Sequence, residues 1–282
     1  MMNKEIKLIA LDIDGTSMNE DGIISDYTRS IIQKIANNYI LVPCSGRGFK
    51  GLVDETLKVE GIDYVVSANG AIVTRVKDKK KLFEALISYE IASSIIEKYT
   101  LDNGFSYVHC IDEDCTHLGY VKNKDVFDER YAVIFGKKYE ELMFNDLPEK
   151  MRQTKMDVAK IGMRFPSIEL AHKYKEIIEN EYEEVNVFNT DIGALEITSK
   201  DASKGSSLKK LCEILNIDCK EVCAIGDNGN DISMIEFAKL GVAMGNALPE
   251  VKKVAKIITT TNNEDGAAHF LEDYLLGGAK KC

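Results

Sequence analysis

The chain has 282 residues, of which 45% are hydrophobic and 29% charged, and its formal net charge is −10. This length is comfortable for two domains, and the composition is that of a globular protein with a sizeable core. The acidic balance argues against a nucleic-acid or anionic-membrane binder, so an anionic substrate would need locally placed cations or a metal.

The first predicted strand is the apolar run from Ile6 to Leu11, which ends in Asp12-Ile13-Asp14-Gly15-Thr16. A run with so little polar interruption is typical of a strand buried on both faces of a parallel sheet. Two carboxylates at its carboxyl end are costly unless something binds them, and ligands of open α/β sheets lie at this end. Asp12 and Asp14 are two residues apart, so in a strand their side chains point the same way.

Strands and helices alternate through the next part of the chain. A helix is predicted from Ser25 to Asn37, because Ser25 is a good N-cap. A short strand, Tyr39 to Pro43, then ends in Cys44-Ser45-Gly46-Arg47, and a polar segment through Glu60 is predicted to be helical. A third strand, Tyr64 to Ser67, ends in Ala68-Asn69-Gly70-Ala71. This order predicts the start of a doubly wound parallel sheet, a Rossmann-like α/β fold.

The pattern changes from about Lys81 to Thr190. Helix-like segments here alternate with strands of mixed polarity, which are typical of an antiparallel sheet with one wet face. The predicted helices are 90–101 and 167–181, and the predicted strands are 105–110, 158–165 and 184–188. We therefore predict an α+β domain at residues 81–190, inserted into a core domain made of residues 1–80 and 191–282.

The strand–helix alternation returns from Leu195. Ser203 can cap a helix from Lys204 to Leu215. A strand from Val222 to Gly226 ends in Asp227-Asn228-Gly229-Asn230-Asp231. After a helix through Lys239, the prediction is completed by strands at 241–244 and 257–259 and a helix at 264–276.

The cysteines and the N-terminus bear on the cellular compartment. Seven Cys are scattered without a paired CxxC motif, which favours reduced thiols in a cytoplasmic protein over a zinc site. We expect no signal peptide, because the first residues run straight into the first strand. We also expect no membrane span, since no apolar run approaches the roughly 20 residues that one needs.

Polar groups stand at four strand ends or helix starts. Each group alone is weak evidence, because a DxDG string or a Ser-Gly-Arg is commonly a turn. The segment from Gly226 to Asp231 also has the composition of a calcium loop, but it lacks the closing Glu and follows a buried strand. The four groups are Asp12 with Asp14, Ser45-Gly46-Arg47, Lys204, and Asp227 with Asp231.

Together these groups predict a phosphoryl-transfer site. Carboxylates from two strand ends suit Mg²⁺, which prefers hard oxygen ligands. Lys204 and the Ser45 hydroxyl can bind a phosphoryl group. Asp12 can attack phosphorus to form an aspartyl phosphate. Asp14 can protonate the leaving oxygen and later activate water.

In this order, the motifs resemble the four motifs of the haloacid dehalogenase (HAD) superfamily. Two further segments, Ser67 to Ala71 and Val242 to Ala247, resemble its Cof-type hydrolases, and the resemblance covers the whole core. It implies that Asp12 is the nucleophile and Asp14 the acid/base. It also implies that Mg²⁺ is held by Asp12, the backbone carbonyl of Asp14 and Asp227. The phosphoryl group would be bound by Ser45, Gly46, Lys204 and Asn230, with support from Thr16, Arg47, Asn69 and Asp231.

The place of the insertion, after Asn69 and before Leu195, resembles the C2 cap class, and its mixed content resembles subclass IIB. One departure from the family pattern is Lys200-Asp201-Ala202 before Ser203, where relatives often carry a Gly. For Arg47 two roles stay open: a contact to the substrate, or an anchor for its turn.

The resemblance implies a Mg²⁺-dependent phosphatase that hydrolyses a small phosphorylated metabolite, such as a sugar phosphate, through an aspartyl phosphate. One alternative is a phosphomutase or phosphotransferase on sugar phosphates. Another is a non-catalytic phosphate-binding regulator on the same fold, whose signature would be the loss of Asp12 or Asp14. We expect a small phosphoester as partner, and neither nucleic acid nor membrane. The substrate and the oligomeric state stay open.

Overall fold

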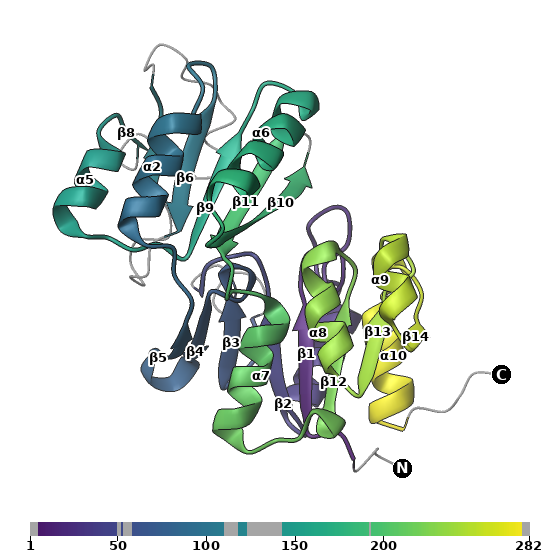
Figure 1. Ribbon diagram of the computed structural model, residues 1–282. Helices are drawn as coiled ribbons and strands as arrows, with labels where there is room; N and C mark the ends of the chain where they lie inside the picture. The colour runs from purple at the N-terminus through teal and green to yellow at the C-terminus, as the bar shows by residue number, and fades with distance from the viewer. Residues whose placement is uncertain are drawn as a thin grey trace. The chain divides into compact units, whose positions relative to one another are not determined.

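The chain divides into two compact units (Figure 1). One unit comprises Met1–Glu84 and Ala202–Cys282, and the other comprises Ala85–Asp201. We call them the core and the cap. The computed structural model describes residues 5–49, 52, 58–109, 118–122, 143–191 and 193–277. Most of the segment before Glu60, which the sequence predicts to be helical, lies outside the described residues.

The core is built on an eight-stranded sheet in the order β14-β13-β12-β1-β2-β3-β4-β5. The strands from β14 to β3 are parallel, and β4 and β5 add an antiparallel edge. All five residues of β1 are buried, as its apolar run predicts. The strands are β1 (Leu8–Asp12), β2 (Ile40–Cys44), β3 (Tyr64–Ser67), β4 (Ile72–Arg75), β5 (Lys80–Glu84), β12 (Val222–Gly226), β13 (Leu240–Ala243) and β14 (Ile257–Ile258).

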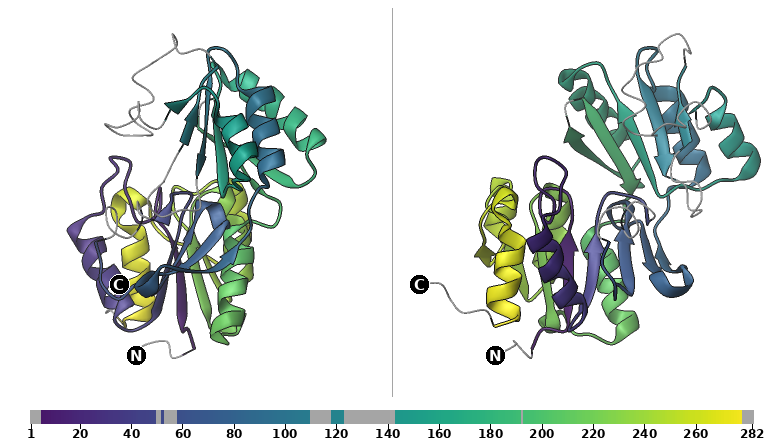
Figure 2. Two further views of the ribbon diagram at one scale, coloured as in Figure 1. Left: turned by 90° about the vertical axis from the view of Figure 1, so that its left-hand side faces the viewer. Right: turned by 180° about the vertical axis from the view of Figure 1, so that it is seen from behind.

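Helices cover both faces of the core sheet (Figure 2, left). Successive residues of β1 point to opposite faces, so Ile9 and Leu11 pack with α1 while Leu8 and Ala10 pack with α7. The core helices are α1 (Asp26–Ala36), α7 (Lys204–Leu215), α8 (Ile232–Phe237), α9 (Pro249–Val254) and α10 (Gly266–Phe270). Short turns of helix add η2 (Ala68–Gly70), η3 (Val76–Asp78), η6 (Cys219–Glu221), η7 (Gly229–Asp231), η8 (Asn262–Glu264) and η9 (Leu271–Leu275).

The cap is an α+β unit with a six-stranded sheet in the order β10-β11-β9-β6-β7-β8. All described pairings in it are antiparallel except that of β7 with β8. Apolar side chains from its three described helices and its strands form one core cluster. These elements are α2 (Tyr89–Tyr99), α5 (Leu147–Thr154), α6 (Ile168–Glu181), β6 (Phe105–His109), β7 (Leu118–Tyr120), β8 (Met143–Phe144), β9 (Lys160–Arg164), β10 (Val185–Asp191) and β11 (Ala194–Ser199).

The boundaries between the units differ from those expected at residues 81 and 190. The strand β5 belongs to the core because it pairs with β4, so the core extends to Glu84. The strand β11 belongs to the cap because it pairs with β9 and β10, so the cap extends to Asp201. In the part of the chain that the structure describes, no helix is long and apolar enough to cross a membrane.

Candidate active site

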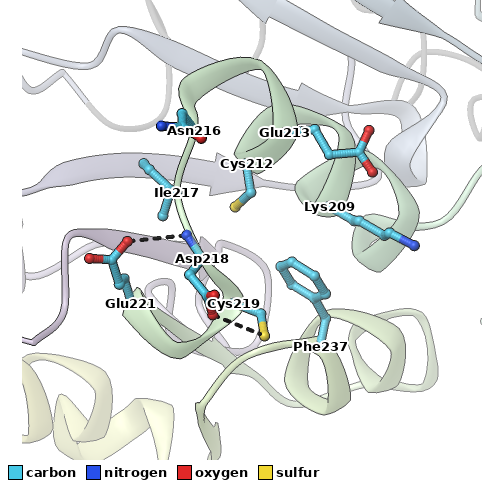
Figure 3. A pocket seen from close by; sticks show the side chains of 9 residues that line it. All are labelled: Lys209, Cys212, Glu213, Asn216, Ile217, Asp218, Cys219, Glu221 and Phe237. Atoms are coloured by element: carbon cyan, nitrogen blue, oxygen red, sulfur yellow. Dashed lines mark hydrogen bonds between the residues drawn. The ribbon is translucent and has the colours of Figure 1, made fainter.

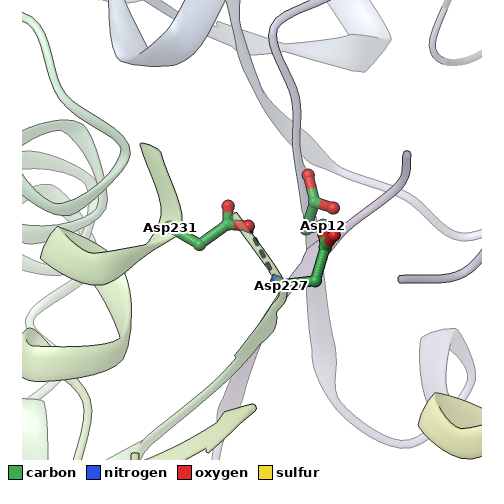
Figure 4. A group of neighbouring side chains, drawn as sticks. All are labelled: Asp12, Asp227 and Asp231. Carbon is green, nitrogen blue, oxygen red and sulfur yellow. Dashed lines mark hydrogen bonds between the residues drawn. The ribbon is translucent and has the colours of Figure 1, made fainter. Parts of the chain in front are cut away.

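Three carboxylates meet at the carboxyl edge of the core sheet (Figure 4). Asp12 ends β1, and Asp227 and Asp231 follow β12, its parallel neighbour. One carboxylate oxygen from each of the three lies within 4.8 Å of the others. Asp12 and Asp231 are buried and Asp227 is half-buried. Such a concentration of negative charge requires a compensating cation.

Lys204 supplies part of that compensation. Its Nζ donates hydrogen bonds to Asp12 Oδ1 at 2.6 Å and to Asp231 Oδ1 at 2.5 Å, and the residue is only 1% exposed. Lys204 is the first residue of α7, whose N-cap Ser203 is fixed by a capping box. Gly70 packs directly against this turn, since a Cβ there would lie 2.2 Å from the carbonyl of Ser203. The helix start is therefore placed by tight backbone packing.

Asp231 holds the other groups in position. Its Oδ1 accepts from Lys204, and its Oδ2 accepts from the backbone N–H groups of Asp227 and Asn228, each at 3.0 Å. Both oxygens are thus engaged within the protein. By contrast, no described group donates a hydrogen bond to Oδ2 of Asp12, although that atom is buried. The carboxylates with room for a metal are therefore Asp12 and Asp227.

The titration behaviour of these groups reflects their burial. Burial raises the pKa of Asp12 well above its usual value, and the charge of Asp231 adds to this while Lys204 opposes it. Burial, followed by the charge of Asp231, raises the pKa of Asp227 to about 6. Burial alone would lower the pKa of Lys204, but its two carboxylate partners raise it above the ordinary value, so it stays cationic. One lysine facing three carboxylates leaves a deficit of positive charge, which suits a divalent cation.

The carboxylate of Asp14 lies in a different set of contacts. Arg47 binds it with Nη2 to Oδ1 at 2.5 Å and Nε to Oδ2 at 2.9 Å, and Ser45 Oγ lies 3.4 Å from Oδ2. The pair is about half exposed, so it adds little to stability but fixes the direction of the carboxylate. This contact joins Arg47 to the Asp14 side chain, and the two roles considered for Arg47 both stay predictions. The predicted metal contact of Asp14 is through its backbone carbonyl and stays a prediction.

A third set of predicted residues meets beside Ser45. Asn230 Nδ2 donates to Asn69 Oδ1 at 3.0 Å, and the Asn69 N–H donates to the Ser45 carbonyl at 3.1 Å. A Cβ at Gly46 would lie 2.8 Å from Asn69 Oδ1, so the loop after β2 lies close against η2. The buried Oδ1 of Asn230 has no donor among the described residues. Polar groups from several loops at the sheet edge therefore converge.

A family model that matches most of the chain identifies its family. The sequence model of the haloacid dehalogenase-like hydrolases matches residues 9–271. The chain belongs to this family. A solved haloacid dehalogenase-like hydrolase from Bacteroides thetaiotaomicron is 29% identical, with a TM-score of 0.78 over 95% of this chain and 99% of that chain.

Two further relatives are phosphatases by name. The 5-amino-6-(5-phospho-D-ribitylamino)uracil phosphatase YitU of Bacillus subtilis (strain 168) is 27% identical over 95% of this hydrolase and 97% of that protein. A solved sugar phosphatase of HAD subclass IIB is 20% identical, and a TM-score of 0.75 over 95% of this chain and 98% of that chain shows a shared fold. The predicted family and fold class are confirmed. The chain is a phosphatase of the HAD family.

The loop after Asp12 connects the carboxylates of this hydrolase. Thr16 Oγ1 donates to Asp227 Oδ1 at 3.1 Å. Gly15 has a positive φ of 82°, and a Cβ there would lie 2.4 Å from Asp227 Oδ2. Only glycine permits both the turn and this close approach. The absence of a side chain at Gly15 therefore leaves room for the Asp227 carboxylate in its observed position.

Two site residues have no assigned role in the sequence analysis. Asn246 Nδ2 donates to the Gly15 carbonyl at 2.9 Å, and Asn262 Nδ2 donates to the Met18 carbonyl at 2.9 Å. Asn246 lies in the segment Val242 to Ala247, which resembles Cof-type hydrolases. The sequence therefore marks this segment but does not indicate what Asn246 contacts. For Asn262 the sequence offers no signal.

A pocket of about 420 Å³ lies at the other end of β12, away from these groups (Figure 3). It is lined by the last turns of α7 and by η6, including Cys212, Asp218 and Cys219, and by Phe237 of α8. None of the predicted site residues lines it. The convergence of motifs at the carboxyl edge, and not the size of a cavity, therefore places the candidate active site at that edge.

Proposed function

We propose that this phosphatase is Mg²⁺-dependent and hydrolyses a small phosphorylated metabolite through an aspartyl phosphate formed on Asp12. The observation that carries the proposal is the state of the Asp12 carboxylate. One of its oxygens is bound by Lys204, and the other is buried without a donor among the described residues. A buried carboxylate oxygen without a partner is costly unless it bonds a metal or reacts.

The residues at the sheet edge fit a magnesium ion. Asp12 and Asp227 offer hard carboxylate oxygens close together, and the backbone carbonyl of Asp14 is the third predicted ligand. When bound, the ion supplies the positive charge that three carboxylates and one lysine lack, and it orients phosphoryl oxygens. Asp231 stays outside this ligand set because both of its oxygens are already used.

In the first step, Asp12 attacks phosphorus. The bond between the Asp12 oxygen and phosphorus forms while the bond from phosphorus to the leaving oxygen breaks, and Asp14 gives that oxygen a proton. Lys204 holds Asp12 in place throughout. Lys204 and Ser45 bind phosphoryl oxygens and stabilise the charge that develops on them.

In the second step, Asp14 takes a proton from water, and the water oxygen attacks phosphorus. The bond from phosphorus to Asp12 breaks, which releases inorganic phosphate and regenerates the free carboxylate. Asp14 acts in both steps, so its direction must be well defined. The paired contacts from Arg47 provide that definition.

The relatives suggest the substrate class. YitU acts on a phosphorylated ribityl compound and the subclass IIB relative is a sugar phosphatase. Both substrates are phosphate monoesters of polyhydroxylated molecules. We propose a small phosphoester of this class for the present enzyme, and neither a nucleic acid nor a membrane as partner. The free thiols of Cys44, Cys212 and Cys223, all buried, are in keeping with a cytoplasmic enzyme.

A screen of phosphorylated metabolites tests the proposal. The protein is incubated with each compound and Mg²⁺, and free phosphate is measured, with Asp12→Asn as the control. Phosphate release that requires both Mg²⁺ and Asp12 is the expected result. An isomeric sugar phosphate without phosphate release would instead indicate a phosphomutase. Release by the Asp12→Asn protein at the wild-type rate would contradict the proposed nucleophile.

A further inference from the structure

We propose that Asn246 and Asn262 are positioning residues for Asp14, which they control by holding the loop that carries it at two points. We call residues 13–18 the catalytic loop. The inference rests on the proposed function, because it assigns the two asparagines to the acid/base step of that reaction. It concerns contacts within the core alone.

The two asparagines form a linked pair of hydrogen-bonding groups. The amide of Asn246 donates through Nδ2 to the Gly15 carbonyl at 2.9 Å and accepts the Asn262 N–H on Oδ1 at 3.0 Å. The amide of Asn262 donates through Nδ2 to the Met18 carbonyl at 2.9 Å. One contact therefore lies directly after Asp14 and the other at the far end of the loop.

The segment that carries Asn262 is itself firmly held. Asn262 is only 7% exposed. The backbone N–H of Gly245 donates to the Thr260 carbonyl at 2.9 Å, which ties the segment to the one that carries Asn246. Further along, Asp265 Oδ1 accepts the hydroxyl groups of Ser25 at 2.6 Å and Thr28 at 2.7 Å. The segment is therefore held by hydrogen bonds at several points.

Contacts to other parts of the core place the catalytic loop. Inside the loop, the Ile13 carbonyl accepts from the N–H groups of Ser17 and Met18, which closes a tight turn, and Thr16 Oγ1 donates to Asp227 Oδ1. The side chain of Asp14 is about half exposed and is held by Arg47 and Ser45. The asparagines fix the backbone on the other side. Asp14 is thus located between two sets of contacts from distant parts of the chain.

The amide of Asn246 meets two demands at its position. The side chain must donate to one backbone carbonyl and accept from one backbone N–H at the same time, and alanine can do neither. With Asn246→Ala, the loop loses its contact one residue after Asp14. The expected result is a misplaced carboxyl group on Asp14, with Asp12 and Lys204 left in place.

Two substrates with different leaving groups separate this effect from a general loss of structure. An alkyl phosphate needs its leaving oxygen to be protonated, whereas p-nitrophenyl phosphate releases a stable phenolate that needs little help. The measured quantity is kcat/KM at saturating Mg²⁺, because it reports the transfer to Asp12 and not the later hydrolysis of the aspartyl phosphate. Asn38→Ala, which removes an exposed amide contact to the Lys34 carbonyl, serves as the matched control.

We expect Asn246→Ala to lower kcat/KM for the alkyl phosphate about tenfold more than for p-nitrophenyl phosphate, a part of the 10²–10⁴-fold that acid catalysis supplies. Asn262→Ala should shift the ratio in the same direction by less, and Asn38→Ala should leave it unchanged. In an Asp14→Asn background, Asn246→Ala should cause little further loss on the alkyl phosphate, because its effect acts through Asp14.

An equal loss on both substrates would overturn the inference, because a smaller folded fraction lowers both rates alike. A full additional loss in the Asp14→Asn background would overturn it as well. Failure of the proposed function looks different: the wild-type protein would release phosphate from neither substrate, or Asp14→Asn would not change the ratio between them.

Discussion

Replacing Gly15 with alanine should disable the metal site, whereas the same change at Gly22 should not. Both glycines have a positive φ, 82° at Gly15 and 74° at Gly22. The backbone cost of alanine is therefore similar at both positions, about 1–2 kcal/mol. A Cβ at Gly15 would lie 2.4 Å from Oδ2 of Asp227 and 2.8 Å from its Cγ, while nothing lies within 4 Å at Gly22. The two variants thus share the strain but not the collision.

The size of the collision sets the expected loss. Non-bonded atoms normally keep about 3.5 Å apart, so either the Asp227 carboxylate or the loop must move by about 1 Å. A misplacement of this size in an active site costs roughly a hundredfold in rate. Urea unfolding with EDTA should show a similar loss of stability in both variants. Titrations of activity with Mg²⁺ should show a loss of about a hundredfold in Gly15→Ala alone.

Two outcomes would refute this reasoning. If Gly15→Ala keeps Mg²⁺-dependent activity at the level of Gly22→Ala, then the position of Asp227 against the loop does not matter for the metal. If Gly22→Ala loses as much activity as Gly15→Ala, the loss comes from strain in the loop. Neither result could be reconciled with the contacts of Asp227.

Three other predictions concern the carboxylates. Asp12→Asn should abolish turnover while thermal unfolding stays cooperative, and substantial remaining hydrolysis would remove Asp12 as the nucleophile. EDTA should remove activity, and Mg²⁺ should restore it. Mg²⁺ should also raise the unfolding temperature of the wild type more than that of Asp227→Asn. Equal rises in the unfolding temperature of both proteins would count against Asp227 as a ligand. The pKa of Asp227 is raised from 3.8 to about 6, so the folded protein binds more protons than the unfolded chain between these values, and stability falls as pH rises through this window. In EDTA above about pH 6, Asp227→Asn should therefore be more stable than the wild type by roughly 2–3 kcal/mol, and this difference in stability should vanish below about pH 4. Urea unfolding of both proteins across this pH range measures the difference. A difference that stays constant with pH would contradict the prediction.

Much of the core could be predicted because the rules that apply to it are local. The apolar run before Asp12 predicts a buried parallel strand, and the structure buries every residue of β1. Asp12 and Asp227 meet because neighbouring parallel strands end at the same edge. Lys204 could be placed near them from its position at a helix start. These inferences need only periodicity, capping and sheet geometry.

Other features depend on tertiary packing and could not be predicted from the sequence. The strand β11 has a pattern that suits either sheet, and only its pairing with β9 and β10 assigns it to the cap. Asp231 follows the same strand as Asp227, and only its hydrogen bonds show that it holds Lys204 and the backbone. Asn246 and Asn262 contact a loop more than 200 residues away. No spacing rule connects positions so far apart.

Trapping the aspartyl phosphate tests the central claim most directly. The enzyme is mixed with substrate and Mg²⁺, quenched rapidly in acid and reduced with borohydride, which converts a phosphorylated aspartate into homoserine. Peptide mass spectrometry then locates the modified residue. The predicted result is homoserine at position 12 in the wild type and no modification in Asp12→Asn. Homoserine at Asp14 or Asp227, or turnover without any modified aspartate, would contradict the proposed reaction.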